Sequence, residues 1–257
     1  MAATNNKGAS ITLYWLEQSR SHRIAWLLEE LNLSYGLKTF KRGSDMLAPA
    51  ELKNIHPLGK SPVISIESPA TSKPLVLAES GAIVEFLCDN FGGEKLIPNK
   101  YAPGKEGQIG GESESWLRYR FYMHYAEGSL MPVMFLTLLV YRIRNAPVPF
   151  FIKPIPWIVA SQIESQFLTR NQEAHFSFLE DQLKTAPDGG KFLCGKELTA
   201  ADILMSFPLI AGADRGVFTK DKYPELTAYT NRLQETEGYK KAVAKIEQVE
   251  GSFQASL

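Results

Sequence analysis

The chain has 257 residues, 44% of them hydrophobic, so it can bury a sizeable core in one large domain or two smaller ones. Basic and acidic residues number 28 each, and this balance provides no overall positive field that would attract nucleic acid. Cys88 and Cys194 are too few for a disulfide framework or a thiolate metal cluster. We expect both to be inert core thiols in a reducing compartment.

The beginning of the chain is small and polar, without the charged start and apolar run of a secretory signal, so residues 1–9 are expected to form a disordered tail. The most apolar stretch, 130–141, is shorter than the ~20 residues that cross a bilayer as a helix, and Pro132 interrupts it. No membrane span is expected.

Residues 10–92 have the alternation of a small α/β domain. β-branched and aromatic residues predict strands, whereas Ile24, Leu27, Leu28 and Leu31 share one face of a helix. The expected strands are 11–16, 35–40, 63–66 and 75–77, the expected helices are 21–31 and 80–90, and a short helical turn follows Pro49.

Residues 93–111 concentrate Gly, Pro, Asn and Lys, a composition typical of a linker. The remainder, 112–257, is expected to be an all-helical domain, with helices at 112–125, 163–183 and 200–213. Prolines within 145–156 should break any helix there. Residues 198–203 read LTAADI, a capping box in which Asp202 has a structural role at a helix start.

Two motifs of the first domain are typical of a binding edge. Residues 56–63 read HPLGKSPV, and Ser61–Pro62 precedes a strand. Residues 77–81 read LAESG at a junction of strand and helix, where Ser80 can act as an N-cap and the first-turn N–H groups attract an anion. Each motif alone fits an ordinary turn or cap, and only their joint spacing favours a site.

Together with the turn at 17–23, these motifs resemble the glutathione-binding half of a glutathione transferase. The resemblance covers Ile11 to about Ile246. It lies within the theta- and nu-like members and is closest to the fungal GTT branch. It implies an α/β thioredoxin-like N-terminal domain, an all-α C-terminal domain with the electrophile site, and a homodimer.

The resemblance also implies a way of holding glutathione. The Ser61–Pro62 bond would be cis, and the Ser61 backbone would pair with the cysteinyl backbone of glutathione. Ser80 and the helix start would bind the γ-glutamyl carboxylate, Glu79 the ammonium group, and Lys60 the glycyl carboxylate. Several relatives place a base before Pro49, whereas this chain has Met46 and Leu47 there.

Ser19 is the expected catalytic residue. In the theta-like pattern a serine four residues before the helix arginine, here Arg23, contacts the glutathione sulfur and donates a hydrogen bond to the thiolate. Ser21 is the second candidate, if the loop register differs, and Tyr14 is the third. A serine at this position argues against thiol transfer through a mixed disulfide, because a hydroxyl cannot form one.

His22 and His56 are expected to be structural, with His22 exposed on the first helical turn and His56 capping a loop. The sequence has no metal-ligand spacing, so no metal is expected. The predicted function is conjugation of the co-substrate glutathione to small hydrophobic electrophiles, with reduction of organic hydroperoxides as a side activity. Such an enzyme would serve cytoplasmic detoxification and the stress response.

Two other functions stay open. The chain could be a non-catalytic glutathione-binding regulatory or interaction module, since fold does not fix function. It could also contact a membrane peripherally through apolar residues at 150–152 and 157–159, although burial in the dimer is the favoured reading of that segment. The apolar insert 130–159 is expected to supply walls of the electrophile site or the dimer contact.

Overall fold

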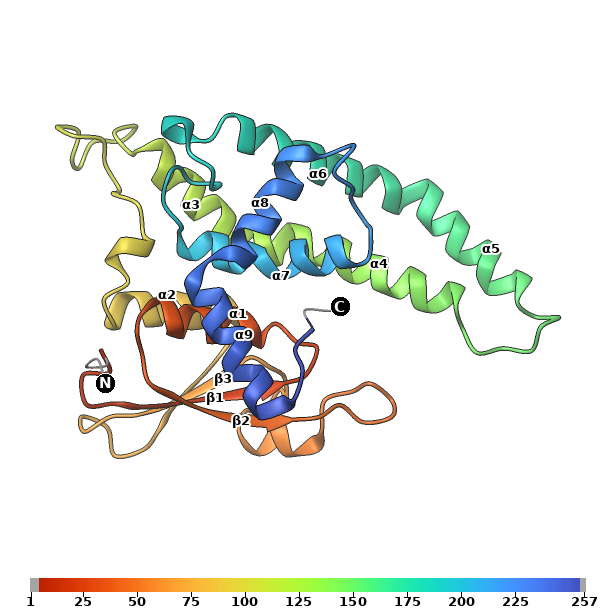
Figure 1. Ribbon diagram of the computed structural model, residues 1–257, viewed down its shortest axis with the longest axis horizontal. Coiled ribbons are helices and arrows are strands. Elements are labelled where there is room, and N and C mark those ends of the chain that lie inside the picture. The colour runs from red at the N-terminus through yellow and green to blue at the C-terminus, as the bar shows by residue number, and fades with distance from the viewer. Residues whose placement is uncertain (1–4, 255–257) are drawn as a thin grey trace.

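The computed structural model describes residues 5–254, which form a small sheet domain beneath a larger helical domain (Figure 1). The first domain has four strands, β1 (Ser10–Leu16), β2 (Tyr35–Phe40), β3 (Val63–Glu67) and β4 (Leu75–Ala78), with helices α1 (Ser21–Glu30) and α2 (Ser80–Asn90). The expected turn after Pro49 is a 3₁₀ helix, Ala50–Asn54. The predicted thioredoxin-like and all-helical architecture is therefore confirmed.

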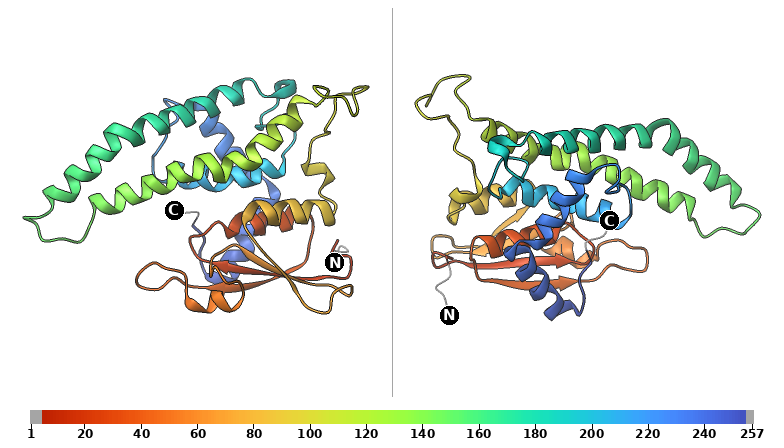
Figure 2. Two further views of the ribbon diagram at one scale, coloured as in Figure 1. Left: turned by 180° about the vertical axis from the view of Figure 1, so that it is seen from behind. Right: turned by 45° about the horizontal axis from the view of Figure 1, so that its top comes forward.

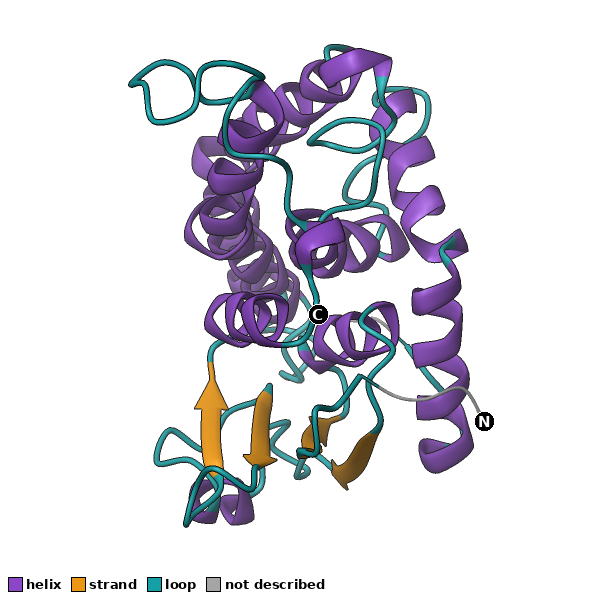
Figure 3. Ribbon diagram, turned by 90° about the vertical axis from the view of Figure 1, so that its left-hand side faces the viewer, coloured by secondary structure: helices purple, strands orange, loops and turns teal. Residues whose placement is uncertain are grey.

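The sheet has the order β2-β1-β3-β4. β1 runs parallel to β2, with Ile11 opposite Tyr35, and antiparallel to β3, which forms a hairpin with β4. Helices α1 and α2 lie between this sheet and the helical domain, as Figure 3 shows from the side. The connections therefore bring the end of β1 and the starts of α1 and α2 close to the beginning of β3.

Helix α1 is covered on both sides, and this overturns one expectation. It packs against β1 and α2, and also against α7 (Ala200–Asp214) and α9 (Glu237–Glu250) of the helical domain. His22 was expected to be exposed, but its side chain is 2% exposed and contacts Phe207, Tyr239 and Phe253. The helical domain supplies this cover, and a short-range pattern gives no sign of it.

Burial determines the protonation state of His22. Loss of solvation, followed by the charge of Arg23, lowers the His22 pKa to about 3. Its Nε2 lies 3.4 Å from the Ser206 hydroxyl, while Nδ1 has no hydrogen-bond partner among the described residues. His22 is thus a neutral packing residue at ordinary pH, in keeping with its expected structural role.

The helical domain begins with a helix longer than expected. α3 (Glu114–Tyr125) continues through a π-helical turn (Ala126–Leu130) into α4 (Met131–Arg144), so the helix passes Pro132. The wider π turn precedes this proline, which has no N–H to donate to the preceding turn. A second long helix comprises α5 (Pro154–Ile163), another π turn (Glu164–Leu168) and α6 (Thr169–Lys184).

Helices α4 and α5 form an antiparallel hairpin that projects from the body (Figures 1 and 2). Residues 145–153 form its loop, as the prolines predict, but the helix resumes at Pro154. Pro154 and Pro156 fit there because the first helical turn has no intrahelical acceptor for their missing N–H groups.

Among the described residues, one helix, Glu114–Arg144, is long and apolar enough to cross a membrane by length and composition. This helix packs against the rest of the protein. It contacts α7, and Glu127, in the middle of the helix, pairs with Arg20 and Arg23 of the first domain. The core helix of a soluble protein passes the same test of length and composition.

The capping box of α7 is confirmed. Asp202 accepts hydrogen bonds from the N–H groups of Thr199 and Leu193 and from the Tyr229 hydroxyl. Helix α8 (Pro224–Glu235), which carries Tyr229, is thereby tied to the start of α7. Asp202 is fully buried and serves the fold, as expected.

At the other end of the chain, part of the expected tail is held to the body. Asn5 donates to the carbonyl of Phe91, and Asn6 to that of Ser34. The rest of the expected tail, residues 1–4, lies outside the described residues.

Candidate active site

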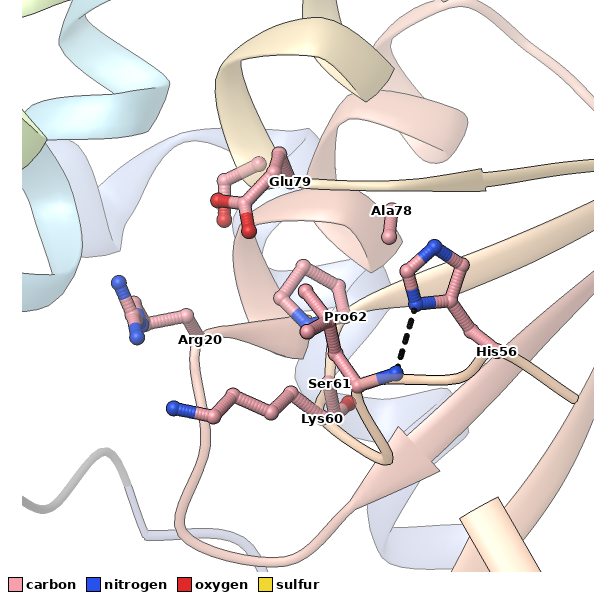
Figure 4. Close-up of a pocket in the computed structure, with 9 residues that line it drawn as sticks. Arg20, His56, Lys60, Ser61, Pro62, Ala78 and Glu79 are labelled. Carbon is pink, nitrogen blue, oxygen red and sulfur yellow. Dashed lines mark hydrogen bonds between the residues drawn. The ribbon is translucent and has the colours of Figure 1, made fainter. Parts of the chain in front are cut away.

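A pocket opens where the segment before β3 meets the β1–α1 turn and the start of α2 (Figure 4). All five residues predicted to bind glutathione line it, together with four others. The lining residues are Arg20, His56, Leu58, Lys60, Ser61, Pro62, Ala78, Glu79 and Ser80. The fold thus gathers into one place residues that two separate motifs contribute.

Backbone at the floor of the pocket lies just outside the sheet. The Ser61–Pro62 peptide bond is cis, and β3 begins only at Val63, so the Ser61 backbone is not part of the strand ladder. Gly59 has a φ of 58°, a conformation that glycine adopts readily, in the turn closed by its N–H to the His56 carbonyl. This turn directs Lys60 into the mouth of the pocket (Figure 4).

Glu79 adopts a backbone conformation that is rare for a residue with a side chain. Its φ is 71° and its ψ is 120°, and its carbonyl accepts from the N–H of Ile83 in the first turn of α2. Such outliers cost about 1–3 kcal/mol and cluster at functional sites. Here the conformation places a carboxylate in the pocket at the start of the helix (Figure 4).

The expected N-cap role of Ser80 is wrong. Glu79 occupies the N-cap position, Ser80 is the first helical residue, and no side chain among residues 5–254 caps the helix. The Ser80 hydroxyl instead accepts a hydrogen bond from Arg23 Nη2 at 3.1 Å. The N–H groups of the first turn therefore remain available to an anion in the pocket.

Arg23 joins this corner of the pocket to the helical domain. Its side chain is 0% exposed, Nη1 donates to the Leu204 carbonyl at 2.7 Å, and Nη2 pairs with Glu127. Burial lowers the pKa of Arg23, an effect that the charge of Glu127 opposes. Burial by itself raises the pKa of Glu127, but Arg23 and Arg20 outweigh it and hold that pKa below its usual range. The ion pair is therefore charged at neutral pH.

Arg20 is the site residue that the sequence analysis missed. It lines the pocket and pairs with the second carboxylate oxygen of Glu127, so one glutamate holds two arginines. The only feature of the sequence that could have indicated Arg20 is that a basic residue lies in the turn at 17–23, which also contains the predicted catalytic serine. Arg20, held by Glu127, and Lys60 give the pocket two cations, and Glu79 gives it one carboxylate, a set suited to an anionic ligand that also has an ammonium group.

The three candidates for sulfur contact do not line the pocket. Ser19 is buried and donates to the Leu16 carbonyl at 2.6 Å, while the Tyr14 hydroxyl pairs with the Ser65 hydroxyl. The Ser21 hydroxyl lies 2.9 Å from that of Ser19 and also contacts that of Ser61. Ser61 donates to the Tyr14 carbonyl. Of the three candidates, Ser19 gives its hydroxyl proton to a carbonyl, whereas the hydroxyls of Ser21 and Tyr14 contact other hydroxyls. Which residue contacts the sulfur stays a prediction.

His56 and the other basic residues near the pocket have structural contacts. His56 Nδ1 accepts the Leu58 N–H at 3.4 Å, which is the expected loop-capping role. Lys41 pairs with Glu250, and Arg42 donates to the carbonyls of Gln18 and Met46. Neither Lys41 nor Arg42 lines the pocket.

The two cysteines are remote from this chemistry. Both are buried, and burial raises the pKa of Cys88 to about 12 and also raises that of Cys194. A buried thiol with a raised pKa is a poor nucleophile, in agreement with the expectation that both are inert. Within residues 5–254 no cluster of His, Cys, Asp and Glu could hold a metal ion.

Comparison with known proteins identifies the family. Residues 19–90 match the N-terminal domain model of glutathione S-transferases, and residues 134–237 match the C-terminal domain model. Glutathione S-transferase 1 of Saccharomyces cerevisiae is 30% identical over 95% of this chain and 98% of its own length. The chain belongs to the glutathione S-transferase family.

Solved structures of glutathione S-transferases share the fold over nearly the whole chain. A glutathione S-transferase from Actinobacillus pleuropneumoniae is 30% identical, covers 95% of each chain and has a TM-score of 0.65. A glutathione transferase homologue from Lodderomyces elongisporus, solved with two glutathione molecules per subunit, is 19% identical. It covers 91% of this chain and 97% of its own, with a TM-score of 0.61, and shows the fold alone. A fungal glutathione S-transferase is thus among the relatives, while the theta- and nu-like assignment stays a prediction.

Proposed function

We propose that this protein conjugates glutathione to small hydrophobic electrophiles. The observation that carries the proposal is the pocket itself, in which the Ser61 backbone, a helix N-terminus, two cations and one carboxylate surround a single space. The glutathione-containing Lodderomyces homologue has the same fold and supports glutathione as the co-substrate.

The residues of the pocket support one way of binding glutathione. Ser80 and the first N–H groups of α2 bind the γ-glutamyl carboxylate, and Glu79 binds the adjacent ammonium group. The Ser61 backbone pairs with the cysteinyl residue as an added strand would, and Lys60 binds the glycyl carboxylate. Arg23 donates to the oxygen of the Ser80 hydroxyl, so the hydroxyl proton is directed elsewhere, toward the carboxylate.

Thiolate formation requires stabilisation of the sulfur anion. A thiol with a pKa near 8.5 must lose about 2 pKa units to ionise at neutral pH, or about 2.7 kcal/mol. A hydrogen bond to a charged group provides about 1.5–3 kcal/mol, and a nearby cation adds to this. We infer that a hydroxyl from the Ser19–Ser21 pair donates to the sulfur, while the guanidinium of Arg20 supplies the cation.

In the first step of the test, the purified protein is titrated with glutathione, and the ultraviolet absorbance of the thiolate is monitored. An aryl halide or an organic hydroperoxide is then added. A saturable thiolate signal with conjugate formation is the expected result. Turnover of the hydroperoxide would establish the side activity. Saturable binding without thiolate or turnover would instead favour a non-catalytic glutathione-binding module.

Three single variants identify the sulfur contact. Ser19→Ala, Ser21→Ala and Tyr14→Phe each remove one hydroxyl. Substitution of the residue that contacts the sulfur is expected to raise the pKa of the bound glutathione thiol by at least about one unit. Glutathione affinity should change little, because the contact matters after ionisation. If the thiol pKa and the turnover are unchanged in all three variants, no hydroxyl contacts the sulfur, and Arg20 becomes the favoured group for stabilising the thiolate.

We also propose a homodimer. Edge strand β4 exposes Leu75 and Val76, and α3 exposes Leu117 and Phe121, apolar side chains typical of a surface that a partner covers. Analytical ultracentrifugation is expected to show a dimer, and Leu117→Glu with Phe121→Glu should give monomers. A monomeric wild-type protein would contradict the proposal.

A further inference from the structure

The tip of the α4–α5 hairpin, residues 142–159, exposes apolar side chains that the proposed transferase site does not use. Phe150 is 82% exposed and Phe151 69%, and their rings meet edge to face at the apex. Ile155 and Trp157 follow in the first turn of α5 and are also exposed. Figures 1 and 2 show that the loop of this tip lies at the end of the projecting hairpin. Arg142, at the base of the tip, is near Arg42 of the sheet domain.

The exposed side chains surround the tip. Successive α-helical residues are rotated by about 100°, so Ile155, Trp157 and Ile158 point in widely different directions from α5. The loop adds Phe150 and Phe151 at the apex. A protein partner would cover one side of such a tip, whereas a medium into which the tip inserts would cover all sides.

The charge of the tip is of one sign. Between Gly128 and Ile163 the sequence has no Asp or Glu, but it has Arg142, Arg144 and Lys153. Arg144 pairs with Glu164 outside this stretch. Arg142 and Lys153 take part in no ion pair within the described part of the chain. Two copies meeting tip to tip about a two-fold axis would bring like charges together.

A hollow beside the apex contains part of this charge. It lies between the loop and α5 and is lined by Arg144 and Lys153 together with Phe150, Pro154 and Trp157. A hollow lined by aromatic rings and by the Lys153 ammonium fits an anionic headgroup placed just above inserted apolar side chains.

We propose that the tip of the α4–α5 hairpin inserts into the interface of an anionic lipid bilayer. Phe150, Phe151 and Trp157 enter the boundary between headgroups and acyl chains, while Arg142 and Lys153 remain at the level of the headgroups. The chain then lies on the membrane without crossing it. This attachment is independent of the transferase chemistry, because none of these residues lines the glutathione pocket.

The test is co-sedimentation of the full-length protein with vesicles of phosphatidylcholine alone or mixed with phosphatidylserine. Binding is expected to the mixed vesicles, to weaken with salt, and to shift the emission of Trp157 to shorter wavelength. Phe150→Ser with Phe151→Ser should lower the partition coefficient by at least about tenfold, because most of the inserted apolar surface is lost. Lys153→Gln should lower it about fivefold.

Matched controls separate the tip from the rest of the surface. Ile109→Ser removes a fully exposed apolar side chain of the linker, and Lys73→Gln removes an exposed cation of the β3–β4 loop. Both should bind vesicles as the wild type does. Failure of the wild type to bind mixed vesicles would overturn the proposal, as would undiminished binding of the double Phe variant. A change from dimer to monomer in that variant without vesicles would instead assign the tip to contact between copies.

Discussion

Arg23 donates to the Ser80 hydroxyl at 3.1 Å and, with the same nitrogen, pairs with Glu127 of the helical domain. The start of α2 is thus oriented by a buried cation whose counter-ion comes from a helix about a hundred residues further along the chain. This arrangement ties the proposed γ-glutamyl site to the contact between the domains.

Replacement of Ser80 by Ala should weaken glutathione binding. The hydroxyl accepts from Arg23 and is proposed to donate to the carboxylate, and loss of one hydrogen bond to a charged group is expected to raise the Kd at least about tenfold. Calorimetric titration measures this. Thr230→Val, which removes a buried hydroxyl in α8, is the control and should bind normally. An unchanged Kd for Ser80→Ala would place the carboxylate elsewhere.

Glu127→Gln should destabilise the protein and its site together. The change leaves Arg23 buried without a counter-ion, a loss expected to cost about 3 kcal/mol of the free energy of unfolding. Urea denaturation measures this. The control is Glu164→Gln, which breaks a partly exposed pair with Arg144 in the hairpin and should cost less than about 1 kcal/mol. Equal effects of the two changes would show that the Arg23–Glu127 pair contributes no more than a surface pair.

Glu79→Gly should make the protein more stable and less able to bind. Glycine has no Cβ, which removes part of the steric strain at φ 71° and ψ 120°, so the free energy of unfolding is expected to rise by about 1 kcal/mol. Glutathione affinity should fall because the carboxylate for the ammonium group is lost. Met46→Gly, at φ 63° and outside the pocket, should stabilise without weakening binding. A Glu79→Gly variant with full affinity would remove Glu79 from the site.

His22 should make the protein less stable in mild acid. Its folded-state pKa is about 3, whereas an imidazole in the unfolded chain has a pKa near 6.5. The unfolded state therefore binds more protons between these values, and stability falls as pH decreases below about 6.5. From pH 7 to pH 5 this amounts to about 2 kcal/mol.

His22→Phe tests the pH dependence, because it keeps an aromatic ring among Phe207, Tyr239 and Phe253 and removes the titration. Urea midpoints at pH 7 and pH 5 should then differ less than in the wild type. His124→Asn, at an exposed position on α3, controls for loss of an imidazole. If the urea midpoints of His22→Phe differ between pH 7 and pH 5 as much as those of the wild type, the acid sensitivity arises from another residue.

The sequence predicted what depends on nearby residues. The four strands, α1 and α2 follow from local periodicity, the Asp202 capping box spans four positions, and the two motifs that line the pocket each lie within a few residues. The errors have a common cause. The exposure of His22, the capping role of Ser80 and the omission of Arg20 were all misjudged because residues distant in the sequence determine them: Phe207 covers His22, Arg23 of α1 donates to Ser80, and Glu127 pairs with Arg20. Periodicity contains no information on which distant side chain will meet a given turn.

The Arg23–Glu127 pair has a consequence for how the protein unfolds. A fragment ending in the linker would keep Arg23 but lose Glu127, the Leu204 carbonyl and the helices that cover α1. Neither domain therefore has a complete interior by itself, and heating should melt both in a single cooperative transition. The two-domain description applies to architecture, while in thermodynamic terms the protein is expected to behave as one unit.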